Sequence, residues 1–386
     1  MRILVINWRC ARNPLAGGAE VYLQEIFKRI VERGHSVTQL AVRFPGSSEI
    51  EILDGIRVVR FGGAQTFNFA VWARLDRILR EGDFDLVIDD LNKIPFYSPW
   101  FCDRPVLALM MHVFRASIFR EVALPFATYV YLTESLIPAC YKNNLFAVLS
   151  PSSRDDLARM GVRNEQMTVI PPGTDSLRFH PDWSRKGENL ILHVGRLKRY
   201  KSTEHLLQAV QILKSRGRAF QVKIVGEGDD LPRLRELSTK LGLDTCVQFT
   251  GFVPEARKVE LYQSAAVLVE NSVKEGWGLI VMEANACGTP VVAARSPGLV
   301  DSVCDGKTGL LYDYGDVKSL AEKLELLLDS PDLRREMGEN GVAWAGRYSW
   351  DRAADAMLEL ICRAAMKPSL SDAIRLSPNP SPSGLA

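Results

Sequence analysis

Short apolar segments alternate with amphipathic segments along nearly the whole chain. Runs such as 106–111 and 265–269 are typical of strands buried on both faces, and the segments between such runs have apolar residues at helical spacing. This alternation predicts right-handed crossovers in parallel sheets, with ligands bound at the carboxyl ends of the strands. It stops at the turn 171–175 and restarts at Leu190. We therefore expect an α/β fold of two facing Rossmann-like domains with parallel sheets and a cleft between them.

The domain boundaries follow from the same pattern. At 386 residues the chain is too long for one ordinary core, and residues 1–178 and 187–346 are the expected domains. The amphipathic segment at about 350–366 predicts a helix that crosses back onto the first domain. Residues 367–386 are rich in Ser, Pro and Gly, which predicts a disordered tail.

The charge balance excludes one broad class of protein. Lys and Arg number 48 against 46 Asp and Glu, giving a net charge of +2, whereas a protein built mainly to bind nucleic acid is usually strongly basic. The seven cysteines form no Cys-x-x-Cys pair and have no histidine at ligand spacing, so we expect neither a zinc site nor a disulfide framework. Residues 1–7 are typical of a strand rather than a signal peptide. We expect a cytoplasmic protein.

A turn between a buried strand and the predicted helix 279–286 carries two glycines and two carboxylates. Gly276 and Gly278 let a ligand approach the backbone, and the amides that open the helix favour a negatively charged group. Glu275 and Glu283 can accept hydrogen bonds from two hydroxyl groups of one extended polar ligand, such as a sugar. Alternatively, Glu275 is a helix-start charge favoured by the dipole, and Glu283 lies on a solvated face.

Two other strand-to-helix turns have the composition of phosphate sites. The segment 195–201 contains four cations. Of these, Arg196 can donate two hydrogen bonds to phosphate oxygens, and Lys201 supplies a compact charge. The alternative for this segment is a solvated basic turn. Gly17 and Gly18 precede a predicted helix whose first amides can contact phosphate, although a glycine pair also suits a simple tight turn.

His112 follows the buried strand 106–111 and so stands at the carboxyl edge of the first predicted sheet. An imidazole donates or accepts a proton near neutral pH, so it can orient a hydroxyl group or take its proton. The alternative is a histidine that only caps the strand end.

The segment 113–141 is rich in Phe, Tyr and Leu. Its charges and prolines are atypical of a helix that spans a membrane. The aromatic and arginine residues that accompany it are Phe67, Phe69, Trp72, Arg74, Arg77 and Arg80. Together they predict a basic, aromatic surface that rests on a membrane, with ordinary core packing and solvated charges as the alternative.

Three motifs in combination resemble those of a known family. They are Gly17-Gly18, Val194-Gly195-Arg196 with Lys201, and Glu275 with Glu283. From residue 1 to about residue 366, the chain is similar to the retaining glycosyltransferases of family 4, also called glycosyl transferases group 1. The resemblance implies the GT-B fold, in which the first domain binds the acceptor and the second binds a nucleotide-sugar donor.

The resemblance also implies roles for the motif residues. Arg196 and Lys201 would hold the donor diphosphate, which Gly18 would approach. Glu275 would contact the sugar hydroxyls, and Glu283 would bind the nucleotide ribose.

Further roles are implied for the turn 251–253 and for His112. The turn would lie against the base, and His112 would face the sugar near its reacting carbon, forming the catalytic set with Glu275. The donor-binding set implied by the resemblance and the glycine turns is Gly17, Gly18, Arg196, Lys201, Gly251, Phe252, Val253, Gly276, Gly278, Leu279 and Glu283.

The implied reaction moves a hexose to a glycan or a lipid-linked acceptor with retention of anomeric configuration. The leaving diphosphate would help to deprotonate the acceptor, and cationic side chains instead of a metal would stabilise its charge, so we expect no cofactor and no metal. The expected setting is cell-surface polysaccharide or glycolipid synthesis, with contact at the inner face of the membrane. The alternatives are a non-catalytic scaffold that binds nucleotide sugars and a GT-B epimerase.

Overall fold

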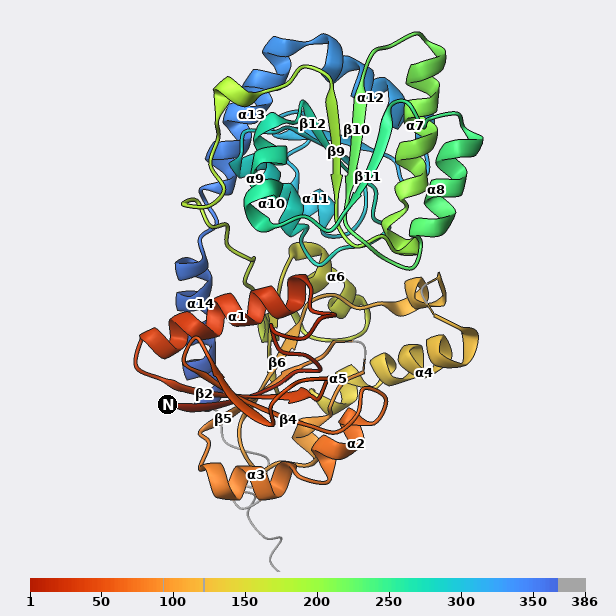
Figure 1. Ribbon diagram of the computed structural model, residues 1–386. Coiled ribbons are helices and arrows are strands. Elements are labelled where there is room, and N and C mark those ends of the chain that lie inside the picture. Colours follow the sequence, from red (N-terminus) through yellow and green to blue (C-terminus); the bar gives the residue numbers. More distant parts are fainter. Residues whose placement is uncertain (93, 121, 367–386) are drawn as a thin grey trace, which may run out of the picture.

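The structure is a computed structural model that describes residues 1–366 except Lys93 and Glu121. It has two lobes, one above the other in Figure 1. The first lobe contains the strands β1 to β8, and the second contains β9 to β14. The predicted disordered tail, residues 367–386, lies outside the described residues.

The sheet of the first lobe has the order β3-β4-β2-β1-β5-β6-β7-β8. Its strands run parallel except at one edge, where β3 and β4 pair antiparallel. The strand order reverses direction between β1 and β5, so the crevice at this switch point lies at the carboxyl ends of those two strands. The strands are β1 (Arg2–Ile6), β2 (Ser36–Val42), β3 (Ile50–Leu53), β4 (Ile56–Phe61), β5 (Leu86–Asp90), β6 (Val106–Met110), β7 (Leu145–Val148) and β8 (Met167–Val169).

The sheet of the second lobe has the order β11-β10-β9-β12-β13-β14 and is parallel throughout. Its switch point lies between β9 and β12. The strands are β9 (Leu190–Val194), β10 (Gln221–Val225), β11 (Val247–Gly251), β12 (Val267–Glu270), β13 (Val291–Ala294) and β14 (Gly309–Tyr312). The two sheets confirm the predicted α/β fold with two Rossmann-like units.

Helices cover both faces of the sheets, as Figure 1 shows. The first lobe has α1 (Gly18–Glu32), α2 (Phe67–Trp72), α3 (Leu75–Gly82), α4 (Leu124–Ser135), α5 (Ile137–Cys140) and α6 (Pro151–Arg159). The second has α7 (Thr203–Ser215), α8 (Leu231–Lys240), α9 (Glu255–Ser264), α10 (Leu279–Ala286), α11 (Leu299–Ser302), α12 (Val317–Asp329) and α13 (Pro331–Ala345). Short 3-10 turns lie at Ser98–Trp100, Arg115–Arg120, Asn164–Gln166, Trp183–Arg185 and Arg199–Lys201. In the part of the chain that the structure describes, no helix is long and apolar enough to cross a lipid bilayer.

The two-sided cover explains why the central strands are apolar throughout. All residues of β6 and β12 are buried. Burial contributes about 25 cal/mol for each Å² of apolar surface, and it is the main term that holds each sheet between its helices.

The last helix, α14 (Trp350–Ala365), packs on the first lobe. Its Trp350 ring lies 6.2 Å from the Tyr22 ring of α1, centroid to centroid. At its exposed side, Asp355 Oδ1 lies 2.7 Å from Arg33 Nη2. An apolar stripe on α14 faces the core of the first lobe, and this stripe anchors the chain to the lobe where it began.

Contacts between the lobes join the carboxyl edges of the two sheets. Lys274 Nζ of the second lobe lies 2.5 Å from Asp156 Oδ2 on α6. The Ser152 amide at the start of α6 donates a hydrogen bond of 3.2 Å to Asp301 Oδ2 on α11. The loops that follow the strands of both sheets therefore meet at the boundary between the lobes.

Candidate functional site

Lys201 ends a 3-10 turn between β9 and α7, beside the switch point of the second sheet. Its side chain is 10% exposed, and its Nζ lies 2.7 Å from Glu275 Oε1 and 3.6 Å from Glu270 Oε1. Glu270 ends β12, and Glu275 follows in the turn that leads to α10. The buried ammonium group of Lys201 therefore lies between the carboxyl groups of Glu270, at the end of the neighbouring strand, and Glu275, in the turn after it.

Mutual attraction keeps Lys201 and Glu275 charged. Burial lowers the pKa of Lys201, but the charges of Glu270 and Glu275 more than offset this, and the pKa lies above its ordinary value. Burial raises the pKa of Glu275, but the positive charge of Lys201 is the largest of the effects that outweigh burial, and the pKa lies below its ordinary value. Glu270 Oε2 is buried without a hydrogen-bond partner among the described residues. Sequence reasoning assigned no role to Glu270.

The glycines of the Glu275 turn make room for other parts of the protein. A Cβ at Gly276 would lie 2.9 Å from the Met111 carbonyl oxygen of the first lobe. Gly278 has a φ of 92°, a conformation that favours glycine, and it precedes α10. A Cβ at Gly298 would lie 2.3 Å from the Glu275 carbonyl oxygen. The Glu275 turn is therefore packed between Gly298 of its own lobe and the Met111 carbonyl of the first lobe.

Glu283 lies on α10 and has partners of its own. Its Oε2 accepts a hydrogen bond of 2.9 Å from the Tyr262 hydroxyl and lies 3.1 Å from Lys258 Nζ. Burial raises the pKa of Glu283 above its ordinary value, although the charge of Lys258 acts against this. Sequence reasoning missed Lys258 and Tyr262. Their spacing of four residues on α9 places both on one helix face, which was the available signal.

Arg196 and Gly17 meet across the boundary between the lobes. A Cβ at Gly17 would lie 2.9 Å from Arg196 Nη2, so only a glycine lets the guanidinium group come this close without a shift. The Gly17 amide donates a hydrogen bond of 2.7 Å to Glu20 Oε2 at the start of α1. Beside it, a Cβ at Gly18 would lie 3.3 Å from Leu279 Cδ1 on α10.

His112 follows β6 and lies between the first sheet and the Glu275 turn. Its ring is half-buried and stands 4.5 Å from the Phe114 ring, centroid to centroid. Its charge is among the groups that lower the pKa of Glu275. The preceding residue, Met111, contacts Gly276 across the boundary. The structure thus brings both predicted catalytic residues to one place.

The predicted base-binding turn 251–253 lies at the end of β11. Gly251 has a φ of 70°, and a Cβ there would lie 3.5 Å from Glu227 Oε1. The Phe252 side chain is 77% exposed, and Val253 packs partly against the core of the second lobe. This turn shares the carboxyl edge of the sheet with Arg196 and Lys201.

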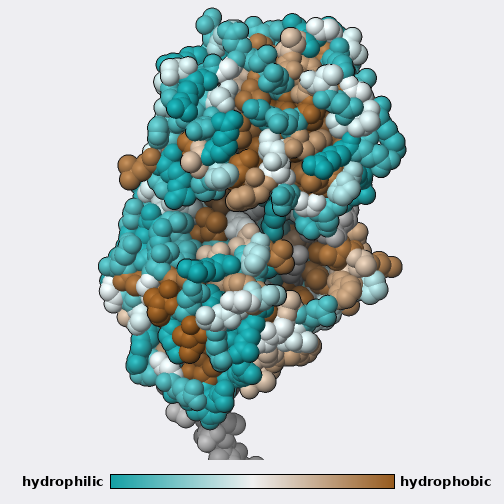
Figure 2. Space-filling model, in the orientation of Figure 1, coloured by the Kyte–Doolittle hydropathy of each residue, from teal (hydrophilic) through white to brown (hydrophobic). Residues whose placement is uncertain are grey.

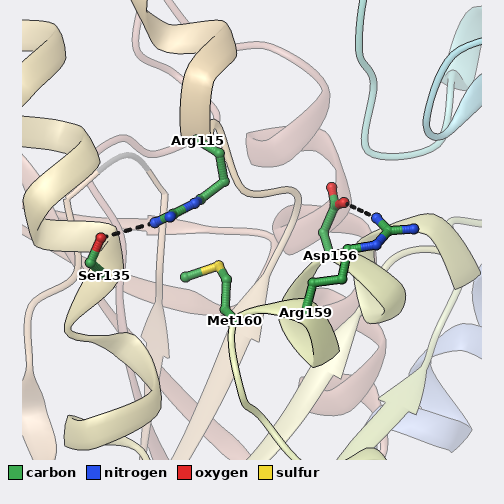
Figure 3. Close-up of a pocket in the computed structure, with 5 residues that line it drawn as sticks. All are labelled: Arg115, Ser135, Asp156, Arg159 and Met160. Carbon is green, nitrogen blue, oxygen red and sulfur yellow. Dashed lines mark hydrogen bonds and ion pairs between the residues drawn. The ribbon is translucent and has the colours of Figure 1, made fainter.

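A hollow of about 400 Å³ lies between α4 and α6 (Figure 3). It is lined by Arg115, Ser135, Asp156, Arg159 and Met160, and we call it the Arg115 hollow. In Figure 3, Arg115 and Ser135 stand on one side, Asp156 and Arg159 stand on the other, and Met160 lies between. None of the lining residues was singled out as a site residue from the sequence, because their proximity depends on how α4 and α6 pack.

Two family models together match most of the chain. Residues 16–178 match the family model "Glycosyltransferase Family 4", and residues 177–344 match "Glycosyl transferases group 1". A D-inositol 3-phosphate glycosyltransferase of Corynebacterium jeikeium (strain K411) is 37% identical over 211 residues, which are 50% of each chain. The chain thus spans about half the length of this curated relative.

Solved structures share the fold over nearly the whole chain. Sucrose-phosphate synthase from Thermosynechococcus elongatus is 22% identical and superposes with a TM-score of 0.80, covering 94% of this chain and 98% of its own. The Anabaena protein HepE in complex with UDP and glucose is 19% identical and has a TM-score of 0.74, covering 94% of this chain and 100% of its own. The chain belongs to glycosyltransferase family 4 and has the GT-B fold.

Proposed function

We propose that the protein is a retaining glycosyltransferase that moves a hexose from a nucleotide-sugar donor to a glycan or lipid-linked acceptor. The observation that carries this proposal is the Lys201–Glu275 pair at the switch point of the second sheet, where it faces the loop of His112. Switch-point crevices are the usual ligand sites of such sheets. The names of the curated relatives, D-inositol 3-phosphate glycosyltransferases, support glycosyl transfer as the reaction class.

The donor diphosphate would lie between Arg196, Lys201 and the first amides of α1. The Arg196 guanidinium lies against Gly17 at the N-terminus of α1, and the Lys201 ammonium lies close to Gly195, the residue before Arg196. HepE, which shares the fold, is in complex with UDP and glucose, so a fold of this kind accommodates a nucleotide and a sugar. We propose that these cations stabilise the leaving diphosphate and that no metal ion is needed.

The sugar would lie beside Glu275 and His112. Ionised Glu275 accepts hydrogen bonds from sugar hydroxyls, and His112 orients the sugar near its reacting carbon. The bond between the anomeric carbon and the diphosphate oxygen breaks, and the acceptor oxygen forms its bond on the same face. The acceptor proton passes to a diphosphate oxygen. Glu283, with Lys258 and Tyr262 behind it, would bind the ribose.

For the setting of this reaction, we propose cell-surface polysaccharide or glycolipid synthesis in the cytoplasm, at the inner face of the membrane. The exposed apolar side chains of α4 support this setting.

Calorimetric titration with UDP, GDP and ADP, and with their glucose, mannose and N-acetylglucosamine conjugates, tests the donor site. We expect one base to bind selectively with EDTA present. Arg196→Ala should weaken that binding by about 10- to 100-fold, because it removes charge-assisted hydrogen bonds. Lys198→Ala is the matched control, since Lys198 stands in the same turn but pairs with exposed Asp229.

Three outcomes would contradict the proposal. If Arg196→Ala and Lys198→Ala lost nucleotide affinity equally, the diphosphate would not lie at Arg196. If no nucleotide bound, the protein would have no donor site of the proposed kind. Binding without transfer to any acceptor extract, with isomerised sugar formed from the donor alone, would identify an epimerase.

A further inference from the structure

Helix α4 exposes a large apolar surface. Leu124, Phe126 and Leu132 are 69%, 65% and 59% exposed. With their exposed neighbours they form what we call the α4 surface: Phe119, Val122, Leu124, Phe126, Tyr129, Leu132 and Leu136. Figure 2 shows hydrophobic side chains gathered over this helix. Apolar patches of this kind on a folded protein mark binding surfaces.

The packing of α4 accounts for this exposure. The inward side chains Ala127 and Val130 form a small cluster with Phe114 and Ile118, apart from the main cores. The charged residue of α4, Glu134, points inward, where its carboxylate accepts hydrogen bonds from the Phe114 and Arg115 amides at 2.6 and 2.7 Å. The outward face of α4 therefore presents apolar and uncharged polar side chains to its surroundings.

The Arg115 hollow adjoins the C-terminal end of this helix. Arg115 donates hydrogen bonds of 2.9 Å to Ser135 Oγ and 3.1 Å to the Tyr131 hydroxyl, and its guanidinium lies 4.2 Å from the Tyr131 ring centroid. Its backbone has a φ of 48°, a strained conformation that the two hydrogen bonds to Glu134 hold in place. The chain thus fixes one guanidinium group at the wall of the hollow.

Among the described residues at the hollow and their ion-pair partners, positive charges outnumber negative ones. Asp156 pairs with Arg159 at 2.8 Å and with Lys274 at 2.5 Å, so its single carboxylate already faces two cations. Arg115 adds a third cation, and cations exceed carboxylates even when buried Glu134 is counted. An anion with several oxygens, such as a phosphate, complements this set.

The hollow also lies close to the proposed sugar site. Lys274 immediately precedes Glu275, and Arg115 follows His112 by three residues. A group bound in the hollow therefore stands next to the loops of both proposed catalytic residues.

We propose that the Arg115 hollow binds the phosphate of a membrane lipid acceptor while the α4 surface rests in the hydrocarbon of the same membrane. This inference rests on the proposed glycosyl transfer and names its acceptor class. An apolar face beside a cationic hollow matches the two parts of an anionic lipid, whereas a soluble glycan would use the hollow alone.

Flotation of the full chain with vesicles tests the proposal. The vesicles are phosphatidylcholine alone, and phosphatidylcholine with an isoprenyl phosphate. We expect stronger binding to the second kind. Arg115→Ala should weaken that binding by about fivefold, as for the loss of one cation near an anionic surface. The double change Leu124→Asp and Phe126→Asp should weaken binding to both kinds by more than about tenfold.

Two matched controls test whether the loss of any exposed arginine, or any exposed leucine, would weaken vesicle binding equally. Arg43→Ala removes an exposed arginine of the first lobe that pairs with exposed Glu49, and Leu326→Asp changes an exposed leucine of the second. Neither should alter vesicle binding. Nucleotide titration and thermal melting of each variant show that the donor site and the fold are intact, so failure of the lipid proposal is distinguishable from failure of the proposed donor site.

Each contrary result would overturn one part of the proposal, either the membrane contact or the phosphate site. Unchanged binding in the α4 double variant would remove the membrane contact. Equal binding to both kinds of vesicle, or equal loss for Arg43→Ala and Arg115→Ala, would show that the Arg115 hollow does not bind the lipid phosphate. Vesicle binding that is absent from the unaltered chain, together with self-association that the α4 double variant abolishes, would make the α4 surface an interface between copies of the protein.

Discussion

Lys201 Nζ lies 2.7 Å from Glu275 Oε1, so the residues with predicted roles toward the donor phosphate and the donor sugar form an ion pair with each other. The pair holds both side chains at the switch point of the second sheet. The charge state of each depends on the other, because burial opposes both charges and the mutual attraction restores them. Side chains fixed in this way are pre-organised for a charged ligand.

Replacing Lys201 with methionine leaves Glu270 and Glu275 together in a buried site without their cation. We expect the free energy of unfolding to fall by about 3–5 kcal/mol, as for other buried pairs that lose one partner. Urea denaturation measures this change. The control Lys198→Met breaks only an exposed pair and should cost less than about 1 kcal/mol. Equal effects of the two changes would show that the buried cluster is not coupled as described.

Asp89 and Asp90, adjacent at the end of β5, are both buried but differ in their hydrogen bonds. Asp89 Oδ2 accepts hydrogen bonds from the Tyr141 hydroxyl at 2.5 Å, the Ser98 amide at 3.0 Å and the Ser98 hydroxyl at 2.7 Å. Both carboxyl oxygens of Asp90 are buried without a partner among the described residues. We expect Asp89→Asn to destabilise the protein by about 1–3 kcal/mol and Asp90→Asn to stabilise it at neutral pH.

The pH dependence of stability provides a separate prediction for Asp90. Burial, with the charges of Glu20 and Asp89, holds the pKa of Asp90 well above its ordinary value. The folded chain therefore binds this proton more tightly than the unfolded chain, and stability is lost as pH rises above about 4 toward the folded pKa. Asp90→Asn should remove this loss. The free energy of unfolding of the variant, measured by urea denaturation, should therefore exceed that of the unaltered protein by an amount that grows with pH over that range. Parallel pH profiles for the two proteins would contradict the prediction.

Gly276→Ala places a methyl group against the Met111 carbonyl oxygen of the other lobe. Because backbone gives way less easily than a flexible side chain, we expect the Glu275 turn to shift and kcat for transfer to fall by about tenfold or more. Nucleotide affinity, measured by calorimetry, should change much less. At Gly63 a methyl group would make only an ordinary contact of 3.6 Å, so Gly63→Ala is the control and should leave kcat unchanged.

Lys274 and Asp156 form a mostly buried ion pair across the lobe boundary, with 13% and 16% of their side chains exposed. A double-mutant cycle with alanine at each position, followed by urea denaturation, should give a coupling energy of about 1–3 kcal/mol. Coupling near zero would mean that the pair does not hold the lobes together.

The fold could be predicted from sequence because its signal is local. The runs 106–111 and 265–269 led to buried parallel strands, and β6 and β12 confirm them, since strands covered on both faces need apolar side chains on both. The antiparallel edge strand β3 (Ile50–Leu53) was not expected. It has only four residues, of which Leu53 alone is buried, so it is too short to give a clear pattern. The ligand-binding roles of the motif residues stay predictions.

The sequence by itself determined the family, the parallel strands of both sheets and the loops that carry Arg196, Glu275 and His112. It did so because strand and helix periodicity and the motif spacings are properties of contiguous residues. Only the tertiary structure decided which charges meet: Lys201 with Glu275 and Glu270, and Lys258 with Glu283. It alone also formed the Arg115 hollow, from α4 and α6. The physical reason is that Coulomb and hydrogen-bond energies depend on distances of a few ångströms, which are set when separate elements pack and not by spacing along the chain.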